Sequence, residues 1–312
     1  MDVCDAPIDP TAAPPPDRVA EPDGYVVVLE RTERIHFLDW GGPGGDGAPG
    51  VLLVHGLSNT AWSWTPVARR IRALGHTVAM DLRGHGLSDA PTDGYQPDSL
   101  AEDVVAVAEG SGLLARPDDR IVLAGHGFGA IVAAWAAAVL GDRCAGLVLV
   151  DGGWEDLAAS TGQEPEEFAR GLDEPPEVLR SIGAYLADRE AFDPATWDAD
   201  QERAARATVV ETHAGHVVPS IRPHALARSV EAMFAYRPGV VLPSVEAPIV
   251  ALVAADDEDG TKSWALATAQ RALDAAGRPP IRVALFPADA HNLMRYRPAE
   301  VAAAILALRS RS

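Results

Sequence analysis

The chain has 312 residues, of which 47% are hydrophobic and 23% charged, so it is long and apolar enough to bury a sizeable core. This composition excludes a fully disordered chain, a collagen and a disulfide scaffold. There are 45 Asp and Glu against 26 Lys and Arg, and the resulting net charge of −19 disfavours a nucleic-acid partner, because acidic surfaces repel phosphate. The two cysteines, Cys4 and Cys144, suit neither a disulfide framework nor a CxxC metal site, so we expect a reducing, cytoplasmic compartment and no metal.

The first 24 residues contain six prolines but no basic segment and no apolar segment. This pattern predicts a flexible tail, and neither a signal peptide nor an anchor. The longest apolar run elsewhere, residues 130–140, is too short to cross a bilayer. We therefore expect a monomer or homodimer without membrane contact, whose partner is a small-molecule substrate.

Beyond the tail, short β-branched runs alternate with longer Ala- and Leu-rich stretches, which is typical of alternating strands and helices. The first two expected strands resemble an antiparallel hairpin, whereas later ones such as 51–54 are apolar throughout, as strands covered on both faces are. The prediction is an α/β fold with an eight-stranded, mostly parallel sheet flanked by helices. The expected strands are 25–30, 34–40, 51–55, 77–81, 120–124, 147–151, 249–254 and 281–286, and the expected helices are 62–73, 99–111, 128–140, 262–276 and 298–308.

The alternation stops in the middle of the chain, where about 90 residues show helical stretches and no convincing strand. We assign residues 1–24 to the tail, 25–152 and 243–312 to the core, and 153–242 to an inserted helical cap. Because aromatic side chains bury much ligand surface, this cap favours a bulky, largely apolar ligand. The aromatic residues of the insertion are Trp154, Phe168, Tyr185, Phe192, Trp197, Phe234 and Tyr236.

Three motifs follow strands at their carboxyl ends, where open α/β sheets bind ligands. They are HGLS at 55–58, GHGFG at 125–129, and the loop that carries His291. Together with DLRGHGLSD at 81–89 and the position of the insertion, they resemble the α/β-hydrolase superfamily across nearly all of 25–308. The resemblance implies a hydrolase that cleaves an ester, lactone or thioester with a Ser-His-Asp triad and without a cofactor.

One position departs from the superfamily pattern. The nucleophile normally stands in the middle of G-x-S-x-G, on a strained turn between strand and helix, and here this position is Gly127. Glycine suits such a backbone, so the fold should survive, but loss of a triad serine costs on the order of 10⁶ in turnover. Two interpretations stay open: a serine enzyme whose nucleophile has been replaced, or a natural glycine. A natural glycine would suit a ligand-binding protein or receptor, or an enzyme in which His291 activates water.

Epoxide hydrolases and haloalkane dehalogenases are less favoured relatives. They place an aspartate at the elbow, and Gly127 is not the first replacement that we would expect for an aspartate.

The resemblance also implies roles for other residues. His291 is the expected base, because its loop follows the final strand. Asp257 is the expected acid by family spacing, with Asp256 and then Asp151 as alternatives. The backbone N–H groups of Leu57 and Phe128 are the expected oxyanion hole, and the side chains expected near the substrate are His55, Ser58, His126 and Trp154.

Overall fold

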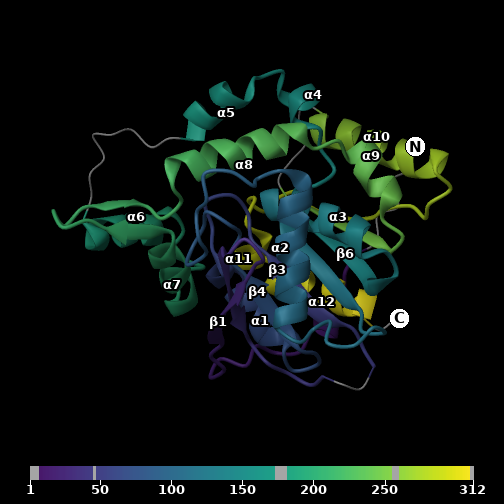
Figure 1. Cartoon of the computed structure of the whole chain (residues 1–312). Coiled ribbons are helices and arrows are strands. Elements are labelled where there is room, and N and C mark those ends of the chain that lie inside the picture. The colour runs from purple at the N-terminus through teal and green to yellow at the C-terminus, as the bar shows by residue number, and fades with distance from the viewer. Residues whose placement is uncertain (1–6, 45–46, 173–180, 255–259, 310–312) are drawn as a thin grey trace.

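The structure is a computed structural model that describes residues 7–44, 47–172, 181–254 and 260–309 (Figure 1). Its centre is an eight-stranded sheet in the order β1-β2-β4-β3-β5-β6-β9-β10. The β1–β2 and β2–β4 pairs are antiparallel and all other pairs are parallel, which confirms the predicted sheet. The strands are β1 (Asp23–Val28), β2 (Arg34–Asp39), β3 (Gly50–Val54), β4 (Thr77–Met80), β5 (Ile121–His126), β6 (Cys144–Val150), β9 (Ile249–Ala254) and β10 (Arg282–Phe286).

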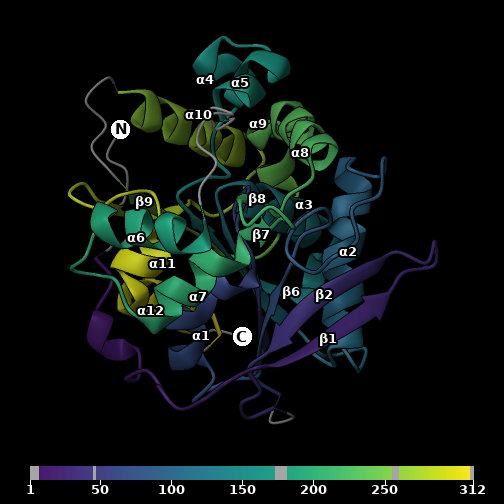
Figure 2. The same cartoon turned by 90° about the vertical axis from the view of Figure 1, so that its left-hand side faces the viewer.

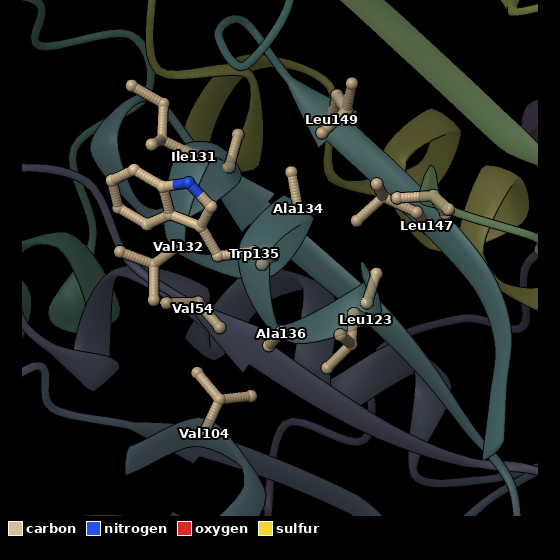
Figure 3. Packing of buried hydrophobic residues seen from close by; sticks show 14 of the residues in the cluster. Val54, Val104, Leu123, Ile131, Val132, Ala134, Trp135, Ala136, Leu147 and Leu149 are labelled. Atoms are coloured by element: carbon tan, nitrogen blue, oxygen red, sulfur yellow. The ribbon is translucent and has the colours of Figure 1, made fainter. Parts of the chain in front are cut away.

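Helices cover both faces of the sheet, which is why its central strands are apolar on both sides. Side chains from α2, α3 and α10 pack on one face, and side chains from α1 and α12 pack on the other. Figure 3 shows part of the first face, where Ala134 and Trp135 of α3 lie among strand residues such as Leu123 and Leu147. The core helices are α1 (Thr65–Ile71), α2 (Pro97–Gly110), α3 (Phe128–Leu140), α10 (Thr261–Ala275), α11 (Leu293–Tyr296) and α12 (Pro298–Arg309).

The insertion between β6 and β9 is mainly helical, and Figure 1 shows α8 running above the core with α4 and α5 beyond it. It also holds a two-stranded antiparallel sheet, so the expectation of no strand in the cap is wrong. Each strand has only three residues, which is too few for a period-two pattern to stand out in the sequence. The elements are α4 (Leu157–Thr161), α5 (Pro165–Leu172), α6 (Ile182–Phe192), α7 (Ala199–Ala207), β7 (Val209–Glu211), β8 (Val217–Pro219), α8 (Pro223–Ala235) and α9 (Pro238–Val241).

The described part of the N-terminal tail is packed against the core. A short 3₁₀ helix spans Pro10–Ala12, Ala13 is buried, and Asp17 pairs with Arg72 at 2.5 Å. The expectation of a flexible tail is therefore wrong for residues 7–22. After the tail, the antiparallel strands β1 and β2 form one edge of the sheet (Figure 2).

Across the described residues, no helix is both long and apolar enough to cross a membrane. Within the same residues, no group of three or more His, Cys, Asp or Glu side chains is placed to hold a metal ion.

Candidate active site

A sharp turn joins β5 to α3, and Gly127 stands at its apex with φ +51° and ψ −116°. The glycines on either side are needed for packing: a Cβ at Gly125 would lie 2.2 Å from the Gly129 carbonyl oxygen, and a Cβ at Gly129 would lie 2.3 Å from the His55 carbonyl oxygen. At Gly127 itself, the atoms nearest to a Cβ would be His291 Nε2 at 3.3 Å, His291 Cε1 at 3.6 Å and Gly56 Cα at 3.9 Å. The turn thus has the positive φ that would be strained for any residue other than glycine, and a Cβ at Gly127 would face His291.

His291 is paired with a buried carboxylate. Its Nδ1 lies 2.5 Å from Asp151 Oδ2, and the other carboxylate oxygen accepts a hydrogen bond from Ala254 N–H at 2.9 Å. Burial alone would raise the pKa of Asp151, but the hydrogen bonds from His291 and Ala254, with the charges of His291 and Lys262, hold it below its ordinary value. The carboxylate is therefore ionised at neutral pH and fixes the tautomer in which Nε2 of His291 accepts a proton.

The structure thus brings the third acid candidate, Asp151, to the histidine. The first and second candidates, Asp257 and Asp256, lie outside the described residues. Asp151 has a positive φ of 43°, and a Cβ at the next residue, Gly152, would lie 2.8 Å from Gly127 Cα. The acid therefore stands on a tight turn in direct contact with the elbow.

His126 supports the loop of the histidine. Its Nε2 lies 3.1 Å from the His291 carbonyl oxygen, and the two imidazole rings are 4.3 Å apart between centroids. Burial, with a smaller contribution from nearby His291, lowers the pKa of His126 to about 3. The ring is therefore neutral at physiological pH and donates its Nε2 proton to that carbonyl.

The two expected oxyanion donors border the same cavity as Gly127 and His291. Phe128 is the first residue of α3, and the N–H groups of the first helical turn have no acceptor within their own helix. Leu57 follows the HG turn after β3. Both residues border the cavity next to Gly127, and their role as oxyanion donors stays a prediction.

A cavity of about 550 Å³ lies between this cluster and the cap. Its wall is mostly apolar, with a smaller set of polar groups. Besides the elbow residues, the wall includes Ile131, Leu157, Phe168, Leu172, Val209, Val217, Val218, Pro219, Ile221, Leu226 and Met233, and the polar side chains Ser58, Asn59, Glu155, Tyr185, Arg189 and Thr208.

Two of the four side chains expected near the substrate do not line this cavity. His55 is fully buried, where its Nδ1 lies 2.8 Å from the Gly56 carbonyl oxygen and its Nε2 accepts the Leu82 N–H at 3.0 Å. Trp154 packs inside the hydrophobic core cluster. Both expectations are wrong, because a motif places a residue near the site without fixing the direction of its side chain. Ser58 and His126 do line the cavity.

Sequence reasoning missed several groups at the site. Tyr185, an expected cap aromatic, reaches the cavity and bonds Thr208 through their hydroxyls at 2.9 Å, while the Arg189 guanidinium lies 4.9 Å from the centre of its ring. Lys262 lies 3.7 Å from Asp151 Oδ1. The available signal for Lys262 was compositional, since it is the single lysine of the chain.

Comparison with known proteins agrees with the fold. The sequence profile of the alpha/beta hydrolase family matches residues 51–304. The 2-(acetamidomethylene)succinate hydrolase of Mesorhizobium japonicum is 30% identical over 154 residues, which are 47% of this chain and 51% of that protein. Esterase PIR7B of Oryza sativa subsp. japonica is 32% identical over 120 residues, which are 38% of this chain and 44% of that protein.

Among solved structures, the crystal structure of E-2-(acetamidomethylene)succinate hydrolase has a TM-score of 0.73 and 23% identity, and the match covers 92% of this chain and 98% of that one. The first curated relatives are matched over 30–51% of their own length. These relatives are hydrolases of different substrates, and the profile match spans most of the sequence. The chain therefore belongs to the alpha/beta hydrolase family.

Proposed function

We propose that this chain is a hydrolase scaffold for a carboxylic ester, lactone or thioester of a fairly bulky, apolar small molecule. Gly127 stands where the nucleophilic serine of a Ser-His-Asp triad belongs, so the chain binds such a molecule and turns it over slowly or not at all. The observation that carries this proposal is the position of His291. Its Nε2 faces the place of a Cβ at Gly127, and its Nδ1 is held by Asp151.

In the serine form, the hydroxyl at position 127 would attack the substrate carbonyl while His291 Nε2 takes its proton. Negative charge would develop on the carbonyl oxygen, where the N–H groups of Leu57 and Phe128 stabilise it. The protonated His291 would then give its proton to the leaving group, which leaves an acyl-enzyme. Water, deprotonated by His291, would release the acid and restore the serine, with Asp151 stabilising the imidazolium in both steps.

The cavity supports the substrate class. Its wall is mostly apolar and is supplied largely by the cap, with polar groups concentrated at the elbow and around Tyr185. Such a pocket buries the apolar part of a ligand while a few polar groups orient its reacting bond. A relative that is named as an esterase agrees with attack at a carboxylic ester.

A second candidate is a non-catalytic ligand-binding protein or receptor that uses the same cavity. Gly127 itself favours it, because a positive φ is comfortable for glycine and strained for serine. This candidate predicts binding without turnover, whichever residue stands at 127.

The test replaces Gly127 by serine and, as a matched control, by alanine. Both substitutions add a Cβ at positive φ beside His291, so both cost about 1–3 kcal/mol of backbone strain, but only serine adds a nucleophile. We expect Gly127→Ser to hydrolyse members of a panel of esters, lactones and thioesters and to form an adduct with a phosphonate probe, while Gly127→Ala does neither. A folded Gly127→Ser protein with no activity and no adduct would refute the enzyme proposal in favour of the binding protein.

Calorimetry on the unaltered chain tests the substrate class. Burying about 200 Å² more apolar ligand surface contributes roughly 5 kcal/mol before ordering costs. We therefore expect a large lactone or polyketide-like ester to bind at least about tenfold more tightly than a short-chain aryl ester. Equal or reversed affinities would show that the cap does not select for size.

A further inference from the structure

We propose that Lys262 is a positioning residue for the Asp151–His291 pair, which holds the carboxylate in place and moderates the basicity of the imidazole. This inference rests on the pair that the proposed function uses as its base and acid. It does not depend on the residue at position 127, so it stands or falls separately from ester hydrolysis.

The contacts form a bridge between two strand ends. The Lys262 ammonium lies 3.7 Å from Asp151 Oδ1 and donates a hydrogen bond to the Ala254 carbonyl. The N–H of Ala254 donates to the same Oδ1 at 2.9 Å, which leaves Oδ2 to His291. Ala254 ends β9 and Asp151 follows β6, its neighbour in the sheet. Lys262 therefore ties the acid to the adjacent strand on the side away from the histidine.

The choice of lysine supports a specific role. Of 26 basic residues in the chain, 25 are arginines, and Lys262 is the single lysine. An ammonium is a compact point charge with three donors, whereas a guanidinium is a wide planar fork. The Lys262 ammonium contacts a carbonyl and a carboxylate oxygen together, and its side chain is only 24% exposed.

The expected effect is electrostatic. A cation within about 4–6 Å stabilises the ionised carboxylate. The same cation disfavours a second positive charge nearby, and protonation would place such a charge on His291. Removing Lys262 leaves Asp151 with a stronger interaction with His291. We therefore expect the protonated form of His291 to persist to higher pH.

Other charged or titratable groups of the described chain also face the pair or its loop. His126 contacts His291 from β5, and Glu155 borders the cavity after β6. Arg295 of α11 is engaged by the cap, where its guanidinium bonds Thr196 Oγ1 at 2.6 Å. Their residues are the same in every variant at position 262, so differences between those variants report on the side chain at that position.

The experiment is an NMR titration of the His291 ring in the full chain with Gly127 in place, with the signal assigned by its loss in His291→Asn. The variants are Lys262→Met, Lys262→Gln as a second neutral form, Lys262→Arg, and Arg271→Met as the control. Arg271 lies nine residues after Lys262 on α10, which is about 13 Å by helical rise, and its guanidinium bonds Thr268. The Arg271→Met variant therefore removes the same charge as Lys262→Met, but at a distance beyond the screening length.

We expect the His291 titration midpoint to rise by about 0.5–1 pH unit in both neutral variants. Lys262→Arg should restore much of the original midpoint, and Arg271→Met should leave it within about 0.2 unit, because the charge that it removes is screened. The inference is overturned if a folded neutral variant keeps the original midpoint, or if Arg271→Met shifts it as far. No readout involves turnover, so failure here and failure of Gly127→Ser to hydrolyse esters are separate results.

Discussion

Nδ1 of His291 lies 2.5 Å from Oδ2 of Asp151, although 140 residues separate them in the chain. The contact is possible because β6 and β10 flank β9 in a parallel arrangement, so Asp151 and the His291 loop both follow strands at the same carboxyl edge of the sheet. The Asp151 N–H also donates a hydrogen bond to the carbonyl oxygen of Leu252 in β9 at 2.8 Å, which places Asp151 against the neighbouring strand. A carboxylate that follows β6 can therefore reach His291, although the family resemblance led us to expect the acid after β9.

The first prediction concerns this acid. In the Gly127→Ser background, we expect Asp151→Asn to lower turnover by about 10⁴, because the orienting carboxylate is lost and the imidazole tautomer is no longer fixed. Asp257→Asn and Asp256→Asn serve as controls and should cost far less. Steady-state kinetics on the three double variants decide the matter, and a dominant loss at either control residue would remove Asp151 from the triad.

The second prediction is a pH dependence of stability. Burial lowers the pKa of His126 to about 3, against about 6.5 in an unfolded chain. Between these values the unfolded chain binds a proton that the folded chain does not, so stability falls as pH falls through this window. One such histidine contributes a slope of about 1.4 kcal/mol per pH unit.

We therefore expect His126→Asn to reduce the slope of unfolding free energy against pH by about this amount between pH 6 and 3.5, as measured by urea unfolding. His213→Gln removes an exposed histidine of the β7–β8 turn and should leave the slope unchanged. An unchanged slope in His126→Asn would mean that His126 is protonated in the folded chain.

The third prediction concerns a buried ion pair. Arg83 and Asp103 form two hydrogen bonds of 2.6 Å, and both side chains are buried. We expect Asp103→Ala to destabilise the fold by about 3–5 kcal/mol, because it leaves a buried guanidinium unpaired. The exposed pair Arg116–Asp119 offers a control, in which Asp119→Ala should cost about 1 kcal/mol or less. Chemical denaturation of both variants provides the comparison, and similar losses would contradict the distinction.

The fourth prediction concerns the tail. Glu21 pairs with Arg69 of α1 at 2.9 Å and with Arg203 of the cap helix α7, while Asp200 of α7 also pairs with Arg69 at 3.2 Å. Because Glu21 is half-exposed, we expect Glu21→Ala to change global stability by less than about 1 kcal/mol. Amide hydrogen exchange in α7 should nevertheless accelerate several-fold, because the ion pairs through which Glu21 links α7 to α1 are lost. Glu211→Ala on exposed β7 is the matched control, and equal exchange in both variants would argue against such a link.

Much of the core could be predicted from the sequence because its signals are local. The apolar runs of β3, β6 and β9 are what strands covered on both faces require, and their predicted ranges agree with the structure to within about three residues. The family resemblance led us to expect His291 near the strand-to-helix turn at Gly127, and the structure places them together. The short strands β7 and β8 were missed, because three residues carry too little periodicity.

Which side chains meet was decided only by the tertiary structure. The sequence offered three acids for His291, and the pairing with Asp151 depends on β6 and β9 lying side by side and on the positive φ of Asp151. His55 and Trp154 belong to regions near the site, yet their side chains turn into the interior. Periodicity and motifs report the backbone environment of a residue, whereas catalytic contacts depend on side-chain directions set by packing between segments far apart in the chain.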